Sequence, residues 1–229
     1  MYTNYDKFGV IISCRYNSKR LPGKALLKFG KYSAISLLIK RIKKSNYIKN
    51  IVLATSLQKE DNHIELEAKK NNIYIFRGSL NNVLNRYVKA AQFYGIEYII
   101  RVTGDCPFID GELIDKCIDQ CKSPESIIYS TKGNFPVGLD IEIIPTKFLE
   151  ELNNNAEISD FNREHIISYF YNSKASKGIQ YFDYVFSKNT IETFTLDEEV
   201  DYKKLNIYFN KLRDPLFSIE NLLNLVSSE

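Results

Sequence analysis

The sequence lacks tryptophan and is poor in histidine, methionine and cysteine, with two His, one Met and four Cys among 229 residues. Only two histidines are available, and Cys117 and Cys121 lie four residues apart rather than in a C-x-x-C pair, so a structural zinc site is not expected. We expect the four thiols, which also include Cys14 and Cys106, to be reduced and mostly buried, as in a cytosolic protein.

The sequence also lacks a dominant charge and a long apolar run. The 31 Lys and Arg residues nearly balance the 28 Asp and Glu residues, for a formal net charge of +3. A dedicated nucleic-acid binder usually carries a stronger basic excess, so nucleic acid is not an expected partner. No apolar stretch is long enough to cross a membrane, and the N-terminus does not have the pattern of a signal peptide. We therefore expect a cytoplasmic protein with small-molecule partners.

What is present is ordinary globular composition, with 44% apolar and 26% charged residues. A chain of this length can bury one full core, and no internal repeat or low-complexity linker divides it. We expect one domain over residues 1–229, with 126–190 as its less regular part.

Strand and helix patterns alternate along the first half of the chain. We expect strands over 8–14, 50–55, 73–76 and 97–103, and helices over 33–45, 59–71 and 81–94. Repeated strand and helix units with short loops predict a doubly wound, three-layer α/β/α fold with a mostly parallel sheet. Ligands in such folds bind at the carboxyl ends of the strands, so the residues that follow each strand are the candidates for function.

The pattern is looser after Pro107. We expect helices over 110–121, 159–172 and 198–212, and strands over 126–130, 139–144 and 193–196.

The loop after the first strand carries four cations within ten residues: Arg15, Lys19, Arg20 and Lys24. Arginine offers two parallel donors, lysine a point charge, and a loop near glycine exposes backbone N–H groups, which together suit phosphates. The alternative is a solvated basic loop, but the position at a strand's carboxyl end favours a phosphate site. The loop is not a Walker A motif, because G-x-x-x-x-G-K-[ST] is absent.

Two aspartates are candidates for a metal site. Asp105 directly follows the fourth strand, and Asp197 follows the short strand expected at 193–196. Mg²⁺ prefers one or two carboxylates, with phosphate oxygens and water as its other ligands. The alternatives are local: Asp105 could open a turn or cap the helix over 110–121, and Asp197 could cap the helix over 198–212.

Several segments in a fixed order resemble the cytidylyltransferase family, which includes the CMP-ulosonic-acid and CMP-acylneuraminate synthetases. They are RYNSKRLPGK, FRGSLNNVLNRY, RVTGDCPFID, FPVGLDIEI, REHI and TLDEEVDYKKL. The resemblance spans nearly the whole chain, and R-x-x-S-x-R-L-P-G-K and G-D-C-P are most similar to the spore-coat-polysaccharide branch. One departure is that Tyr16-Asn17 stands where the CMP-sialate enzymes have two glycines, which leaves the acceptor open.

The resemblance implies a nucleotidyltransferase fold and a nucleotide site at the basic loop. Arg15, Ser18 and Lys24 would hold the triphosphate, while Asp105 and Asp197 would hold Mg²⁺. Arg15, Lys24 and Asp105 would be the catalytic residues. Gly104 and Arg77 are further nucleotide-site candidates, and Arg86 is a weaker one.

The resemblance places the acceptor beside the segments GLDIEI and REHI, within the part over 126–190. The candidate acceptor-binding residues are Asp140, Glu142, Arg163 and His165, with Glu164 between the last two. His165 is a candidate general base, although a lone histidine on a helix is more often structural.

The function implied is transfer of a nucleoside monophosphate, CMP from CTP, to a sugar-like or sugar-phosphate-like acceptor with release of pyrophosphate, for polysaccharide biosynthesis. The residues themselves do not distinguish CTP from GTP or UTP. One alternative is a metal-dependent glycosyltransferase, since Asp140-Ile141-Glu142 looks like a relaxed D-x-D motif. Another is a regulatory module that binds a nucleotide without turnover. The resemblance also favours a homodimer.

Overall fold

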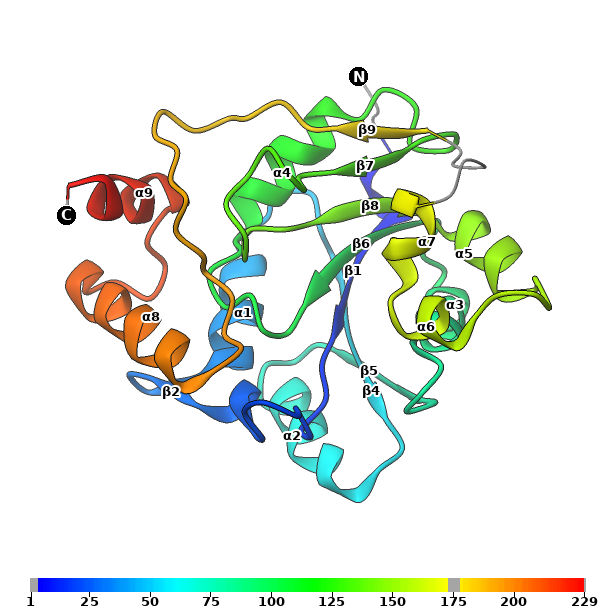
Figure 1. Cartoon of the computed structure of the whole chain (residues 1–229), viewed down its shortest axis with the longest axis horizontal. Helices are drawn as coiled ribbons and strands as arrows, with labels where there is room; N and C mark the ends of the chain where they lie inside the picture. The colour runs from blue at the N-terminus through cyan, green and yellow to red at the C-terminus, as the bar shows by residue number, and fades with distance from the viewer. Residues whose placement is uncertain (1–3, 173–177, 229) are drawn as a thin grey trace.

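The computed structural model describes residues 4–172 and 178–228. Within them, a seven-stranded sheet has the order β5-β4-β1-β6-β8-β7-β9 (Figure 1). The first four strands are parallel, β8 is antiparallel to both of its neighbours, and β9 is parallel to β7. The strands are β5 (Tyr74–Gly78), β4 (Asn50–Ser56), β1 (Phe8–Ser13), β6 (Tyr98–Thr103), β8 (Glu142–Pro145), β7 (Ile128–Ser130) and β9 (Ile179–Tyr181).

Helices cover both faces of this sheet and form two separate apolar layers (Figure 1). The side chains of β1 alternate between the two layers: Val10 and Ile12 face one layer, and Ile11 faces the other. The first layer is covered by α1 (Ala34–Ile42), α2 (Asn62–Lys70), α4 (Gly111–Gln120), α8 (Glu199–Leu212) and α9 (Ile219–Ser227). The second is covered by α3 (Val83–Tyr94), α5 (Thr146–Asn153), α6 (Asp160–Glu164) and α7 (Ile166–Asn172). The predicted doubly wound α/β/α fold is therefore confirmed.

Local signals in the sequence account for where several helices begin and end. Ser33 accepts a hydrogen bond from the backbone of Ser36 at the start of α1, and Asp110 accepts one from Leu113 at the start of α4. Gly95 ends α3 in the left-handed conformation, with φ of 66°. These caps explain why helices expected from apolar periodicity lie close to their predicted positions.

Two predicted elements are wrong. Residues 193–196 form no strand; instead the Phe194 N–H donates to Val137 O and the Leu196 N–H donates to Asp105 O, both at 2.7 Å. Phe194 and Leu196 are fully buried, so their apolar pattern reflects burial between loops rather than a ladder. The helix expected over 159–172 is broken at His165, whose φ of −106° and ψ of 66° are not helical.

Some elements are not expected from the sequence pattern. They are α5, α9, β9 and the two-stranded hairpin of β2 (Lys28–Phe29) and β3 (Tyr32–Ser33). No helix among residues 4–172 and 178–228 combines the length and the apolar character needed to cross a bilayer.

All four cysteines are free and buried, as predicted. Burial is the largest influence on Cys14 and, with the nearby charge of Asp105, it raises the pKa of this thiol to about 12. At that pKa the thiolate fraction at neutral pH is about a thousandfold below that of an ordinary exposed thiol. We expect the native protein to react negligibly with a thiol reagent such as DTNB within minutes, and the urea-unfolded protein to release four equivalents. Rapid modification of the native protein would contradict this burial.

One buried arginine fastens the loop after β6 to the C-terminal region. Arg41 is 1% exposed and donates to Phe108 O from Nε and Nη2, at 3.2 and 2.9 Å. Its Nη1 donates to Pro215 O at 3.2 Å and to Phe217 O at 2.8 Å, and its guanidinium lies 4.0 Å from the Phe217 ring centroid. Burial lowers the pKa of Arg41 to about 10, so it remains a cation at neutral pH.

Candidate active site

The site lies where the strand order changes direction. From β1 the chain moves through β4 to β5 on one side of the sheet and then returns to β6 on the other. The carboxyl ends of β1 and β6 therefore lie side by side, with Ser13 opposite Thr103. In an open α/β sheet the crevice at this switch point is where ligands bind. The basic loop leaves β1 here, and Gly104 and Asp105 follow β6.

Gly104 is needed for the close approach of these two strand ends. Its N–H donates to Ser13 O at 2.9 Å, and a Cβ added to it would lie 2.8 Å from Cβ of Cys14. Any side chain at this position would therefore push the basic loop away from the loop that carries Asp105.

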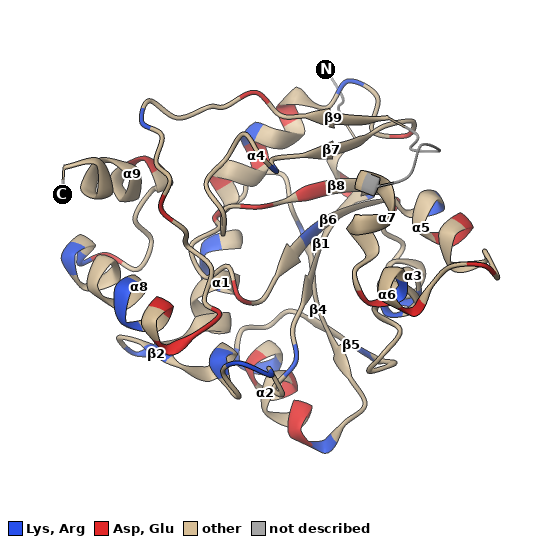
Figure 2. Cartoon of the chain, viewed as in Figure 1, with Lys and Arg blue, Asp and Glu red and all other residues tan. Residues whose placement is uncertain are grey.

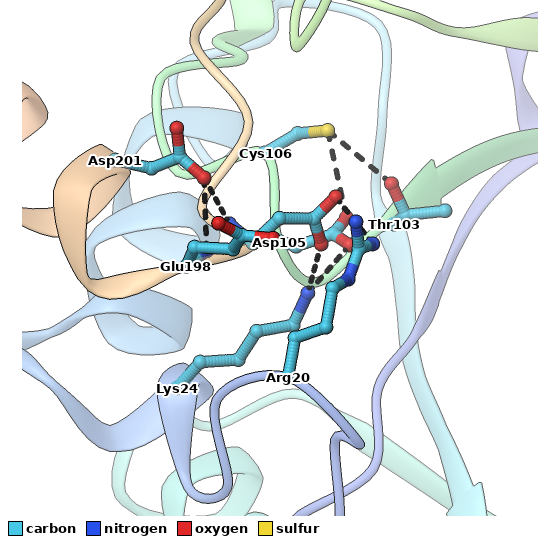
Figure 3. Close-up of polar contacts among 8 residues, drawn as sticks. Arg20, Lys24, Thr103, Asp105, Cys106, Glu198 and Asp201 are labelled. Atoms are coloured by element: carbon cyan, nitrogen blue, oxygen red, sulfur yellow. Dashed lines mark hydrogen bonds and ion pairs between the residues drawn. The ribbon is translucent and has the colours of Figure 1, made fainter.

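An ion-pair cluster joins the basic loop to both candidate metal ligands. Lys24 Nζ lies 2.9 Å from Asp105 Oδ2 and 2.7 Å from Asp197 Oδ1. Arg20 Nη2 lies 2.7 Å from the other oxygen of Asp197. Figure 3 shows Lys24 and Arg20 reaching from the loop toward the carboxylates, and Figure 2 shows the basic loop beside the acidic start of α8.

The cluster is half-buried and strongly coupled. The side chains of Lys24, Asp105 and Asp197 are 14%, 26% and 28% exposed. Burial alone would raise the pKa of Asp105, but the charge of Lys24 and its hydrogen bond outweigh burial and hold the pKa below its ordinary value. Burial would likewise lower the pKa of Lys24, but the two carboxylates raise it. Asp105 and Lys24 are therefore both ionised at neutral pH.

Two helices begin near these aspartates, and other residues cap them. The side chain of Asp110 caps α4, and Glu198 with Asp201 forms a capping box at the start of α8. The capping roles considered for Asp105 and Asp197 are thus filled elsewhere. Asp105 and Asp197 point instead at one shared cation, Lys24.

The donor set fits Mg²⁺. No group of three or more His, Cys, Asp or Glu side chains arranged for a metal occurs in the described part of the chain. Mg²⁺ does not need one, because it binds proteins through one or two carboxylates and takes phosphate oxygens and water as further ligands. Since one ammonium reaches Asp105 and Asp197 at hydrogen-bond distance, a single divalent cation could also contact both.

Arg15 contacts different segments from those that Lys24 contacts. Its Nη1 donates to Leu80 O and its Nη2 to Glu164 Oε1, both at 3.1 Å. The basic loop thereby contacts α6, the short helix that carries Arg163 and Glu164. Ser18 remains within the loop, where its N–H donates to Tyr16 O at 3.1 Å.

The two other candidate arginines are held within the fold. Arg77 lies inside β5 and donates to Ser56 O at 2.9 Å and Gln58 O at 2.6 Å, with a further ion pair to Glu65. Arg86 is 1% exposed and donates to Ser79 O and to Ser13 Oγ. These bonds direct both guanidinium groups to segments that surround the strand ends rather than to the Lys24 cluster.

The candidates for acceptor binding lie at or just before the start of β8, and on α6 or at its end. Glu142 is 3% exposed and its carboxylate is 2.7 Å from Arg101. Asp140 accepts a hydrogen bond from the Gly138 N–H at 2.8 Å, and burial raises the pKa of Asp140 above its ordinary value.

The remaining candidates belong to the segment REHI. Arg163 makes a long contact of 3.5 Å to Asn155 O, and the His165 ring lies 4.7 Å from that of Phe161. Glu164, which lies between Arg163 and His165, contacts the basic loop through its ion pair with Arg15.

Comparison with known proteins now decides the family. The model of the cytidylyltransferase family matches residues 9–222. The chain belongs to the cytidylyltransferase family. The resemblance carried by the sequence motifs is thereby confirmed.

Individual relatives agree. The chain is 30% identical over 223 residues to the spore coat polysaccharide biosynthesis protein SpsF of Bacillus subtilis, covering 95% of this chain and 92% of that protein. It is 38% identical over 161 residues to an uncharacterised protein of Methanocaldococcus jannaschii, covering 70% of this chain and 65% of that protein, slightly under two thirds. A cytidylyltransferase structure from Leptospira borgpetersenii has a TM-score of 0.89 and 31% identity, covering 97% of this chain and 94% of that one.

The sequence assigned no role to some residues of this candidate site. Arg20 is one of the four loop cations and a fixed position of R-x-x-S-x-R-L-P-G-K, and only the structure shows that it contacts Asp197. Asp61 lies in a segment predicted as a charged helix, yet it is 2% exposed. A charged residue in a charged helix gives no signal of burial, so only the structure separates Asp61 from its exposed neighbours.

Proposed function

We propose that this cytidylyltransferase transfers CMP from CTP to an oxygen of a sugar-like acceptor. The acceptor oxygen would attack the α-phosphorus, the bond to the bridging oxygen would break, and pyrophosphate would leave. The observation that carries the proposal is the bridge from Lys24 to Asp105 and Asp197 at the strand-order switch point. This bridge supports the proposal, because a Mg²⁺–triphosphate would need a basic loop and carboxylates side by side.

Positioning and charge neutralisation dominate in such a transfer. Mg²⁺ held by Asp105 and Asp197 would neutralise charge on the triphosphate. Arg15 and Lys24 would bind the phosphates that leave as pyrophosphate, with Ser18 and backbone N–H groups of the loop. Lys24 would exchange its carboxylate contacts for phosphate oxygens when the nucleotide binds.

The acceptor would lie toward β8 and α6. Asp140 would accept hydrogen bonds from sugar hydroxyls, and Glu142, which is 3% exposed and paired with Arg101, would do so by exchanging that ion pair. Arg163 on α6 and His165 at its end would also bind the acceptor. The pair of Arg15 and Glu164 supports this placement, because it connects the nucleotide loop to α6. If the acceptor group is a phosphate it needs no strong base; a hydroxyl would need activation, for which His165 is the candidate.

The rival functions are less well supported. A glycosyltransferase would need Asp140 and Glu142 as metal ligands, but Glu142 is 3% exposed and paired with Arg101, and burial raises the pKa of Asp140 whereas that of Asp105 is lowered. A regulatory module would bind nucleotide without turnover. Cytoplasmic location and a homodimer stay predictions from the sequence and its resemblance.

Thermal unfolding with Mg²⁺ and each of CTP, UTP, GTP and ATP tests the nucleotide without knowledge of the acceptor. A ligand at 100 times its Kd stabilises by about 2.7 kcal/mol, so we expect CTP to raise Tm by about 5–10 °C for a chain of this size. Pyrophosphate release would then be screened with sugar acids and sugar phosphates. A shift with nucleotide-sugars and none with any triphosphate would favour the glycosyltransferase instead.

A further inference from the structure

Asp61 is a buried carboxylate that holds the backbone of the basic loop. It is 2% exposed and precedes α2. Its Oδ1 accepts a hydrogen bond from the Tyr16 N–H at 2.6 Å, and its Oδ2 accepts one from the Ser56 N–H at 3.0 Å and another from the Ser56 hydroxyl. Asp61 thus joins the loop after β1 to the end of β4.

Tyr16 directly follows Arg15 in that loop, and its backbone N–H and carbonyl are both hydrogen-bonded. Its N–H is held by Asp61, and its carbonyl accepts hydrogen bonds from Ser18 N at 3.1 Å and from Gly23 N at 2.9 Å. Gly23 has a φ of 72°, a conformation that glycine adopts without strain, and Lys24 follows it directly. Lys24 is therefore connected to Asp61 through two hydrogen bonds, the backbone of Tyr16 between them, and the peptide bond from Gly23 to Lys24.

The ring of Tyr16 strengthens the same connection. It packs over Gly23, where an added Cβ would lie 3.5 Å from the ring, and its centroid is 5.6 Å from that of His63 on α2. The loop is therefore held to the start of α2 by both a backbone hydrogen bond and a ring contact.

We propose that Asp61 is a positioning residue for the basic loop: through the backbone of Tyr16 it sets where Gly23 turns and where Lys24 meets Asp105 and Asp197. It contacts no substrate in this role. The consequence for CTP binding rests on the proposed function, whereas the effect on the loop itself does not.

The chemistry of the contact requires a carboxylate. Three donors, two N–H groups and one hydroxyl, converge on the two oxygens of Asp61. An amide in its place would direct an NH₂ group at one of these N–H groups, so that one hydrogen bond would be replaced by a repulsive contact. The hydrogen bonds also outweigh burial and hold the pKa of Asp61 below its ordinary value.

Asp61→Asn tests the proposal against Asp115→Asn as a matched control. Asp115 is also buried, at 7% exposed, and accepts hydrogen bonds from the Ser45 hydroxyl and from the Asn46 N–H at 2.7 Å. Its partners Ser45 and Asn46 precede β4, whereas Ser56, one partner of Asp61, ends that strand and Tyr16, the other, lies in the basic loop. Both variants are expected to lower Tm, and only Asp61→Asn is expected to loosen the basic loop.

Two readouts separate positioning from general stability. Limited trypsin digestion of the nucleotide-free protein should cleave after Lys19, Arg20 or Lys24 at least about tenfold faster in Asp61→Asn than in Asp115→Asn. Calorimetry with CTP and Mg²⁺ should show about 10- to 100-fold weaker binding in Asp61→Asn alone, since small misplacements have effects of that size. Equal loop cleavage in both variants would overturn the proposal.

Failure of the proposed function can be distinguished from failure of the proposal for Asp61. If wild-type protein binds no CTP, the proposed function fails, while the trypsin comparison still decides the role of Asp61. If Asp61→Asn does not fold, Ser56→Ala removes one of its three donors and keeps the backbone N–H; it should increase loop cleavage in the same direction by a smaller factor. Unchanged cleavage in that variant would overturn the proposal.

Discussion

Asp105→Asn is expected to lower the turnover number for pyrophosphate release by roughly 10³-fold or more, while the protein stays folded. The substitution keeps the shape of the side chain but removes the charge that pairs with Lys24 and would hold Mg²⁺. Lys24 keeps its 2.7 Å contact with Asp197, so the loop should remain in place and Tm should change little. Turnover with CTP and an acceptor found by the screen, together with circular dichroism, measures both effects.

Asp6→Asn is a suitable control for this variant. Asp6 lies at the amino end of β1, is 71% exposed and pairs with the exposed Lys49, so its loss should leave turnover unchanged. Wild-type activity in Asp105→Asn would remove both the metal and the catalytic assignment of Asp105.

Lys24→Met is expected to have two opposite effects on binding. It should weaken CTP binding by about 10- to 100-fold, because a charge-assisted contact to the triphosphate is lost. In the absence of nucleotide it should strengthen the binding of Mn²⁺, used as a probe for Mg²⁺, because Asp105 and Asp197 lose the cation that now occupies them. The variant should be less stable than wild type without metal and regain stability when Mg²⁺ is added.

Arg20→Met is the matched comparison for Lys24→Met. Arg20 is 61% exposed and contacts Asp197 at the oxygen that Lys24 does not use, so solvent screens its charge and both effects should be smaller. Calorimetry with CTP and with Mn²⁺ gives the two affinities. Unchanged CTP affinity in Lys24→Met would mean that the basic loop is a solvated surface, and unchanged Mn²⁺ affinity would mean that the two aspartates do not form a metal site.

The sequence predicts this fold best where one short segment decides its own structure. The strands β1 and β4 contain continuous apolar runs and β6 is apolar except for Arg101 and Thr103, and Ser33 marks the start of α1. Because parallel strands bring their carboxyl ends to one edge of the sheet, the sequence pattern alone is enough to place the basic loop beside Asp105.

The prediction fails where distant segments decide the outcome. Phe194 and Leu196 look like strand residues, but their N–H groups bond to Val137 and Asp105, far away in sequence. The pattern over 159–172 is helical on both sides of His165 and does not reveal the break. Asp61 is the same kind of case, since its burial depends on Tyr16, 45 positions away.

The set of hydrogen bonds made by Arg41 has a consequence for the order in which the site forms during synthesis. It joins the loop after β6 to Phe217, 176 positions beyond Arg41, and Lys24 meets Asp197 across 173 positions. The chain leaves the ribosome N-terminus first, so Lys24 and Asp105 can pair while Asp197 and Phe217 do not yet exist. A nascent chain of this length therefore has the basic loop and Asp105. It still lacks Asp197 and the hydrogen bond from Arg41 to Phe217. The complete candidate site therefore forms only after the segment that carries Asp197 has been synthesised and has docked.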